Sequence, residues 1–221
     1  MARKPWKPMI SLLRSYGSAQ SNARRLEELG GQPGLHGVFA SSMLLDDQAE
    51  LVIKAKKKAM IKFYMRPERL NELRLERTLA YYEQLGVDGL VLPCDLHPET
   101  HAAIHRLKLG LKLILCKEKA SIYERSAQVE LETSFKSVCE RHAFDGVAFT
   151  ERKNEQSVMP MARGADPVMR FVYIETPERA SDALQRGASH LLIPGGIFAT
   201  PRQNADKFWR IIETLQPGRD V

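Results

Sequence analysis

The chain has 221 residues, of which 43% are hydrophobic, and a formal net charge of +6 at pH 7. Its longest apolar runs have the length of single strands, and its three cysteines lack C-x-x-C spacing, which argues against a membrane span, a disulfide framework and a zinc knuckle. The apolar run over 9–13 is too short for a signal peptide, so we expect one cytoplasmic domain over residues 1–221.

Short apolar, β-prone runs alternate with amphipathic segments along the chain. Eight strands are predicted, over 9–13, 36–40, 59–64, 89–92, 111–116, 145–150, 170–174 and 190–194. This alternation is typical of a closed α/β barrel, the single-domain (β/α)8 or TIM barrel. An open doubly wound sheet is the alternative, but the regular alternation as far as the last strand favours closure.

The predicted helices have clear start and stop signals. A helix over 23–29 ends at Gly30, and a longer one over 67–85 carries leucines at helical spacing and ends at Gly86. Thr176–Pro177 combines a hydroxyl N-cap with proline in the first turn of a later helix.

The third predicted strand resembles that of a known enzyme family. Residues 60–67 read Met-Ile-Lys-Phe-Tyr-Met-Arg-Pro, which is similar to the D-x-K-x-x-D strand and following I-P of the orotidine 5′-monophosphate decarboxylase superfamily. Lys62 and Pro67 match, whereas Met60 and Met65 stand where the family has aspartates. Segments 86–91, 144–148 and 187–197 are similar to the family's fourth, sixth and closing units. The chain resembles a divergent member that lacks both aspartates.

The resemblance implies a fold and a set of expectations about activity. It implies a TIM barrel, a homodimer, and a metal-free lyase of pyrimidine metabolism that uses no cofactor. The family's lysine protonates the carbanion left by loss of carbon dioxide, so Lys62 is the candidate catalytic residue. Without the aspartates, we expect orthodox decarboxylation to be absent or very slow.

Barrel architecture directs attention to the carboxyl-terminal ends of the strands, where loops present side chains. Arg14, Tyr64 and Lys117 are the candidate ligand-binding side chains there. We expect Lys62 to point into the lumen towards this mouth, where burial without carboxylates would favour the neutral, nucleophilic amine and Schiff-base chemistry. The alternative is a lysine at the edge of the barrel that reaches solvent or pairs with a glutamate.

Gly195 and Gly196 follow the last predicted strand, where the family has a G-R pair that holds phosphate. Backbone amides in this turn can bind a phosphate without a side chain. A tight turn that needs glycine is the alternative, and the two interpretations are compatible.

Two other groups of polar residues have structural explanations. His97, His101 and His105 have the spacing of a metal site on one helix, but they project away from its apolar face and predict an exposed stripe, so no metal is expected. Cys94 and Cys116 are expected to be buried apolar thiols. The positive charge favours an anionic ligand, and the absence of interleaved aromatic and basic residues predicts no nucleic-acid partner.

Three functions remain open. The first is a lyase or other enzyme that acts on a phosphorylated small molecule through Lys62. The second is a non-catalytic barrel that binds a phosphorylated ligand or another protein. The third is an orthodox decarboxylase with carboxylates from Asp46, Asp47, Asp95 or Glu151. Fold alone does not decide among them.

Overall fold

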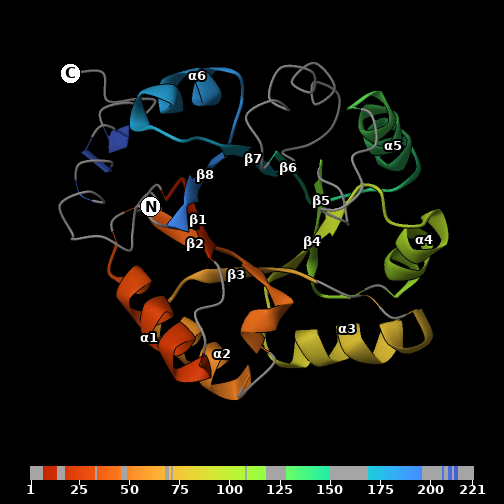
Figure 1. The fold of residues 1–221 in the computed structure, drawn as a ribbon, viewed down its shortest axis with the longest axis horizontal. Helices are drawn as coiled ribbons and strands as arrows, with labels where there is room; N and C mark the ends of the chain where they lie inside the picture. The colour runs from red at the N-terminus through yellow and green to blue at the C-terminus, as the bar shows by residue number, and fades with distance from the viewer. Residues whose placement is uncertain are drawn as a thin grey trace, which may run out of the picture.

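Eight parallel strands close into a barrel, as the alternation of strands and helices predicts. A computed structural model describes residues 7–13, 18–32, 34–45, 49–67, 70, 72–107, 109–117, 128–149, 169–195, 206, 209–210 and 212–213. Each strand pairs with the next along the chain, and the first pairs with the eighth, which completes a (β/α)8 barrel. Helices surround the ring of strands (Figure 1).

The strands occupy nearly the predicted positions. They are β1 (Met9–Leu13), β2 (Leu35–Ser41), β3 (Lys62–Arg66), β4 (Gly89–Pro93), β5 (Lys112–Cys116), β6 (Gly146–Phe149), β7 (Met169–Tyr173) and β8 (His190–Pro194). The helices between them are α1 (Ala19–Gly30), α2 (Ala49–Ala59), α3 (Leu75–Gln84), α4 (Pro98–Arg106), α5 (Gln128–Arg141) and α6 (Ala180–Gln185). Short 3-10 turns occur over Ser42–Leu45, Glu72–Arg74 and Pro177–Arg179. Among the described helices, none is long and apolar enough to cross a membrane.

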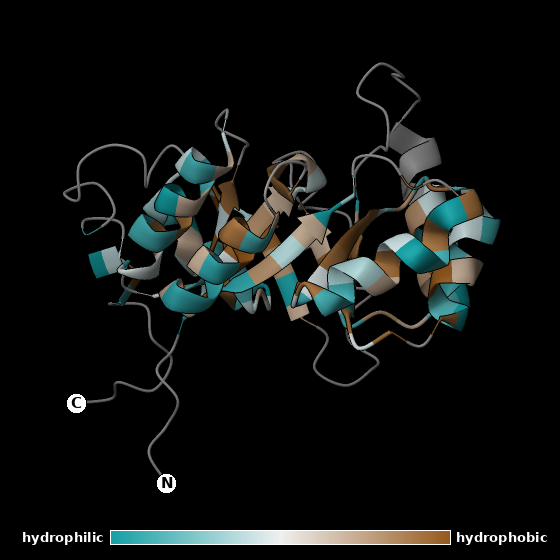
Figure 2. Cartoon of the chain, turned by 90° about the horizontal axis from the view of Figure 1, so that it is seen from below, coloured by the Kyte–Doolittle hydropathy of each residue, from teal (hydrophilic) through white to brown (hydrophobic). Residues whose placement is uncertain are grey.

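Alternation along the strands separates two buried layers. One set of side chains fills the lumen: Ile10, Phe39, Tyr64, Val91, Ile114, Cys116, Ala148, Phe171 and Leu192. The intervening residues face the helices and form the larger outer core, which includes Phe63, Leu90, Leu115 and Leu191. The helices turn apolar faces to this layer and hydrophilic faces outward (Figure 2).

Two helices begin at other residues than predicted. The helix expected over 23–29 starts at Ala19, because the Ser18 hydroxyl caps it by accepting a hydrogen bond from the Ser21 N–H. The helix expected over 67–85 is regular only from Leu75, after the 3-10 turn. The amphipathic pattern therefore locates both helices but not their first turns.

At the amino-terminal rim, the side chain just before β4, β6 and β8 binds the strand that precedes each of them in the ring. Asp88 accepts the Phe63 N–H at 2.9 Å, and its own N–H donates to the Phe63 carbonyl. The same reciprocal contact joins Leu113 with Asp145, and Arg170 with Ser189. We call these three contacts the rim clasps. They lie at the β3/β4, β5/β6 and β7/β8 seams.

Glycines allow close approach at the alternate seams. A β-carbon on Gly37 would clash with the Lys62 carbonyl, one on Gly89 would lie 2.6 Å from the Lys112 carbonyl, and one on Gly146 would lie 2.9 Å from the Met169 carbonyl. In the dipeptides 88–89 and 145–146, the aspartate therefore binds the backbone of the preceding strand. The glycine, which lacks a β-carbon, allows the following strand to approach closely.

Candidate functional site

Cationic and polar side chains lie at the carboxyl-terminal mouth of the barrel. Arg66 ends β3 and, two residues after lumen-facing Tyr64, leaves the strand on the lumen side. Lys117 directly follows β5; its N–H donates to the Ala148 carbonyl at 3.0 Å and the residue is only 1% exposed. Tyr173, at the end of β7, has a raised pKa because of burial and then the nearby Glu175 carboxylate.

Arg66 was missed as a candidate by the sequence reasoning. With the third strand placed over 59–64, Arg66 falls beyond its end, whereas the strand is Lys62–Arg66. Pro67 could have indicated that the strand continues as far as Arg66, because proline is commonly found where a strand ends. Lys117 lies at the end of its strand, as expected.

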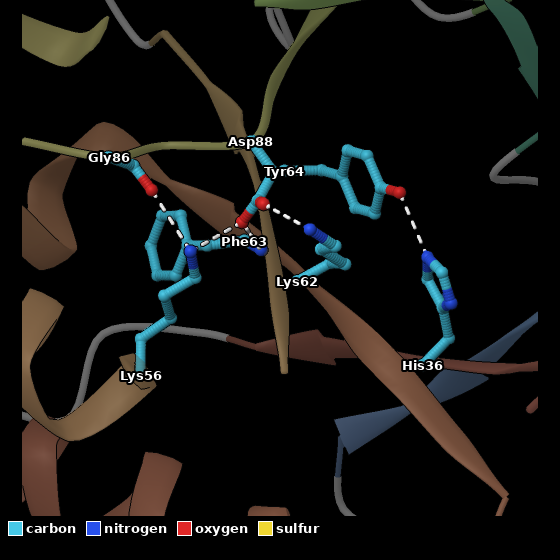
Figure 3. Close-up of polar contacts among 7 residues, drawn as sticks. All are labelled: His36, Lys56, Lys62, Phe63, Tyr64, Gly86 and Asp88. Carbon is cyan, nitrogen blue, oxygen red and sulfur yellow. Dashed lines mark hydrogen bonds and ion pairs between the residues drawn. The ribbon is translucent and has the colours of Figure 1, made fainter. Parts of the chain in front are cut away.

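Lys62 lies at the opposite end of the barrel from its predicted place. It is the first residue of β3, its side chain is 54% exposed, and its Nζ lies 2.8 Å from Asp88 Oδ1 (Figure 3). The expectation that it points to the carboxyl-terminal mouth is therefore wrong. The alternative, an edge-of-barrel lysine paired with an acidic side chain, is correct, with an aspartate in place of the expected glutamate.

The two methionines of the resembling segment do not line the mouth either. Met60 lies in the turn before β3 and is 84% exposed, whereas Met65 is buried in the outer core under the helices. Neither residue can take the place that a lumen-facing aspartate would have. Residues 60–67 are thus similar to the family's strand in sequence, but their side chains do not lie at the mouth of the barrel.

Asp88 is the centre of the polar network around Lys62. Its carboxylate also lies 2.7 Å from Lys56 Nζ, which in turn donates to the Gly86 carbonyl at 3.0 Å (Figure 3). Burial acts to raise the pKa of Asp88, but hydrogen bonds from Lys56, Lys62 and the Phe63 N–H outweigh it, and the net pKa is lowered. This network holds β3 to β4 and α2.

Tyr64 belongs to this end of the lumen and contacts a histidine. Its hydroxyl lies 3.0 Å from His36 Nε2, and burial, followed by the charges of Asp88 and Asp145, raises its pKa (Figure 3). His36 reaches the lumen because β2 has an extra residue there: Met9 pairs with Leu35 and the next residue of β1 pairs with Gly37. The structure brings Tyr64 together with His36 rather than with Lys117.

A second histidine completes this aromatic layer. The His36 and His190 rings meet edge to face with centroids 4.7 Å apart, and His190 also stacks on Phe171. Burial, and then the neighbouring His36, lowers the pKa of His190 to about 4. Burial and then Lys62 lower the pKa of His36. Both rings are therefore neutral at pH 7.

The turn after β8 is tightly packed and contacts an arginine. A β-carbon on Gly195 would overlap the Leu12 carbonyl of β1, and Arg25 Nη2 donates to the Gly195 carbonyl at 3.2 Å. Gly195 is therefore needed for the close packing of its backbone against β1, and the tight-turn interpretation of the two glycines stays a prediction. Gly196 and Arg14, the other two candidates at this end, lie outside the described residues.

The predicted exposed histidine stripe is wrong for His101 and His105, whereas His97 is exposed. His101 is fully buried, and His105 stacks on His142 of the following helix at 4.7 Å. Burial, then His142 and His105, lowers the pKa of His101 to about 4. The stripe is covered because α5 leads into His142 and Phe144, which pack against it. The described residues contain no group of three metal-ligating side chains with the geometry of a metal site.

Cys94 and Cys116 are buried thiols that are not joined in a disulfide, as expected. The Cys94 N–H donates to the Cys116 carbonyl at 3.0 Å, so their backbones meet where β4 and β5 end. Cys139 on α5 is also free and has a pKa raised to about 11 by burial and then by Glu140. Such thiols are poor nucleophiles at neutral pH.

The chain is similar to known structures but not to known sequence families. No protein-family model matches it, and no curated sequence is significantly similar. Solved structures share its fold: orotidine 5′-phosphate decarboxylase from Pyrococcus horikoshii aligns with a TM-score of 0.71 at 13% identity, over 93% of this chain and 99% of that one. The Lactobacillus acidophilus decarboxylase gives 0.72 at 13%, over 96% and 100%. Thiamine phosphate pyrophosphorylase from Pyrococcus furiosus gives 0.59 at 10%, over 96% and 98%.

Proposed function

We propose that this barrel, similar in fold to orotidine 5′-phosphate decarboxylases, binds a phosphorylated small molecule at its carboxyl-terminal mouth. The observation that supports the proposal is that three cationic residues belong to segments that end at, or reach, this one end of the barrel. Arg66 comes from the end of β3, Lys117 follows β5, and Arg25 reaches the turn after β8. The neighbours named for phosphorylated compounds share the fold and support the proposal by analogy.

The physical basis is the strength of charge interactions away from bulk water. A guanidinium forms bidentate hydrogen bonds to phosphate, and an ammonium acts as a compact point charge. Lys117 is almost fully buried, so its charge acts in a medium of lower effective dielectric constant than water. The net charge of +6 adds a weak long-range attraction for anions.

A non-catalytic binding role is favoured over a lyase that works through Lys62. The Lys62 ammonium is paired with Asp88 at the amino-terminal rim, and a ligand in the mouth would lie at the far end of the strands. A homodimer, a cytoplasmic location and a place in pyrimidine metabolism remain predictions from the resemblance to the decarboxylase superfamily.

The proposal is tested by ligand-induced thermal stabilisation. A panel of nucleotides and sugar phosphates should raise the melting temperature of the intact protein. Lys117→Gln and Arg66→Gln should each reduce that shift, whereas Lys62→Gln, at the other rim, should leave it unchanged. The absence of a shift with every compound would refute phosphate binding and favour a structural or protein-binding role.

A further inference from the structure

Two histidines lie at the amino-terminal end of the lumen, opposite the mouth. His36 is the second residue of β2 and His190 is the first residue of β8, and their ring centroids are 4.7 Å apart. Both side chains are partly exposed, whereas Tyr64 and Phe171, which they contact, are buried. The two imidazoles therefore lie between the aromatic filling of the lumen and solvent.

The contact with Tyr64 decides which nitrogen of His36 can donate to a ligand. The Tyr64 hydroxyl is buried and lies 3.0 Å from His36 Nε2, and it makes no other hydrogen bond within the described residues (Figure 3). A buried hydroxyl with an unpaired proton would carry a desolvation cost, so the Tyr64 O–H donates to Nε2. Neutral His36 then carries its own proton on Nδ1. In the described part of the chain this N–H has no acceptor.

Positive charge is in excess around His36. Burial, then Lys62 and more weakly Lys7, act to lower the pKa of His36, whereas Asp88 acts to raise it. The Asp88 carboxylate is shared between two lysines, because it lies 2.8 Å from Lys62 Nζ and 2.7 Å from Lys56 Nζ. Three ammonium groups thus stand against one carboxylate. Among the described residues of this cluster, two positive charges remain uncompensated.

The two exposed lysines stand on either side of His36 in the ring of strands. Lys62 begins β3, and Lys7 lies just before β1, where the Pro8 carbonyl accepts the Leu191 N–H at 2.7 Å and fixes the chain against β8. Strand β2 lies between β1 and β3, so the backbones of the two lysines are about 9–10 Å apart, twice the spacing of neighbouring strands. An anion with two separated charges therefore matches them better than a compact one.

We propose that this cluster binds a small dicarboxylate at the amino-terminal end of the barrel. One carboxylate of the ligand pairs with Lys62 and accepts the His36 Nδ1–H, and the other pairs with Lys7, beside His190. The ligand brings two negative charges to a cluster that has two uncompensated positive charges. Its site lies at the opposite end of the strands from the proposed phosphate site and does not depend on that proposal.

Lys112 is a rim lysine in the same structural position but without a histidine. Lys62 and Lys112 are the first residues of β3 and β5, their side chains are 54% and 53% exposed, and each pairs with an aspartate. Each also pairs in register with a glycine of the preceding strand. The residue before that glycine is His36 at one seam and Asp88 at the other. Lys112 is therefore the matched control for Lys62.

The test is a titration of the full chain with succinate, followed by NMR of the histidine rings at pH 7. Succinate should shift the His36 and His190 signals saturably, and sodium chloride at the same ionic strength should not. Lys62→Gln and Lys7→Gln should each weaken binding about three- to fivefold, the upper range for an exposed ion pair. Lys112→Gln should leave the dissociation constant unchanged. Acetate, with one carboxylate, should bind at least about threefold more weakly than succinate.

A second readout places the ligand next to the imidazole. An anion beside His36 favours the charged ring, so saturating succinate should raise the pKa of His36 measured by NMR. The groups that face His36 are Lys62, Lys7, Asp88, Tyr64 and His190, and succinate changes the charge near all of them. In Lys62→Gln the same concentration of succinate should raise this pKa less.

Several outcomes would overturn the proposal. The absence of a saturable shift with succinate, or an equal shift with sodium chloride, would show that no specific site exists. Equal losses in Lys62→Gln and Lys112→Gln would show only a diffuse attraction to the rim. Equal affinities for acetate and succinate would refute the two-charge ligand. If Lys62→Gln does not fold, Lys7→Gln gives the same comparison, since Lys7 makes no ion pair with the described residues.

Discussion

The Lys62 ammonium and the Asp88 carboxylate form an ion pair 2.8 Å long that joins β3 to β4 at the amino-terminal rim. The same carboxylate accepts the Phe63 N–H and pairs with Lys56, so one side chain connects two strands and a helix. In (β/α)8 barrels, this end of the strands is associated with stability and the other end with chemistry. Lys62, which resembles a catalytic residue in sequence, is therefore part of the contacts that hold β3 to β4.

The first prediction compares the aspartates of two rim clasps. The Asp88 side chain is 16% exposed and pairs with two lysines, whereas Asp145 is 44% exposed and lies 3.7 Å from Lys112. Asp88→Ala should lower the free energy of unfolding by about 3–5 kcal/mol, the cost of leaving a buried partner uncompensated. Asp145→Ala should cost clearly less. Urea unfolding at pH 7 measures both, and equal losses would contradict the ranking of the two clasps.

The second prediction concerns acid pH and the buried histidines. His101 has a pKa of about 4 in the folded state, below its ordinary value of 6.5. Between pH 4 and 6.5 the unfolded chain therefore binds a proton at His101 that the folded protein does not. Stability is complete above pH 6.5 and falls as the pH drops towards 4, by roughly 2–4 kcal/mol for this one residue. His101→Leu should flatten the dependence of the unfolding free energy on pH in this range. An unchanged slope would mean that His101 is protonated in the folded protein.

The third prediction concerns the turn before β3. Met60 has a φ of 54°, the left-handed conformation that costs a residue with a β-carbon about 1–2 kcal/mol. Met60→Gly should raise the free energy of unfolding by about 0.5–1 kcal/mol, because glycine adopts this conformation without strain. Met60→Ala is the control and should give no gain. Chemical denaturation measures the three proteins, and equal effects of alanine and glycine would exclude backbone strain as the cause.

The fourth prediction tests the packing of the β8 turn. Gly195→Ala places a methyl group on the Leu12 carbonyl and should lower the melting temperature and weaken phosphate binding together. Gly31→Ala is the matched control, since an added β-carbon there meets only the Glu28 carbonyl at 3.9 Å and the backbone is right-handed. Normal stability and binding in Gly195→Ala would show that the turn can move away from β1.

The fifth prediction concerns orotidine 5′-monophosphate itself. Lys62 lies at the rim opposite the mouth, so we expect no decarboxylation above background, since positioned charges usually provide the largest part of catalysis. Spectroscopic assay of the purified protein measures it. Turnover on the order of one per second or faster, as typical enzymes show, would contradict the prediction, and its loss in Lys62→Ala would show that it depends on Lys62.

The sequence predicts the barrel well because period-two apolar strands and amphipathic helices are local patterns. Strands β1 and β8 have the predicted bounds, and the others differ by a few residues. The difference that matters most for the site is the start of β3, which is Lys62 and not residue 59. Helix α2 continues to Ala59, and Met60 takes the left-handed position at which glycine usually marks a helix end. Without that glycine, the helix and strand patterns run together, and Lys62 is placed in mid-strand rather than at its start.

The site is less predictable because it depends on contacts between distant segments. Arg24 and Arg25 have the same sequence context, and only the packing of α1 against the β8 turn separates them. His101 is likewise a polar residue within α4, and its burial depends on His142, which follows about forty positions later. Such tertiary effects override what local periodicity can indicate.

The rim clasps also bear on the order in which the barrel is assembled. Their partners are separated by only 25, 32 and 19 residues along the chain, so each clasp joins segments that are close in sequence. Contacts of short sequence separation have a small loop-closure cost and form early. A chain emerging from the ribosome can therefore complete these strand pairs one after another, and only the β1–β8 seam has to wait for the whole barrel to be synthesised.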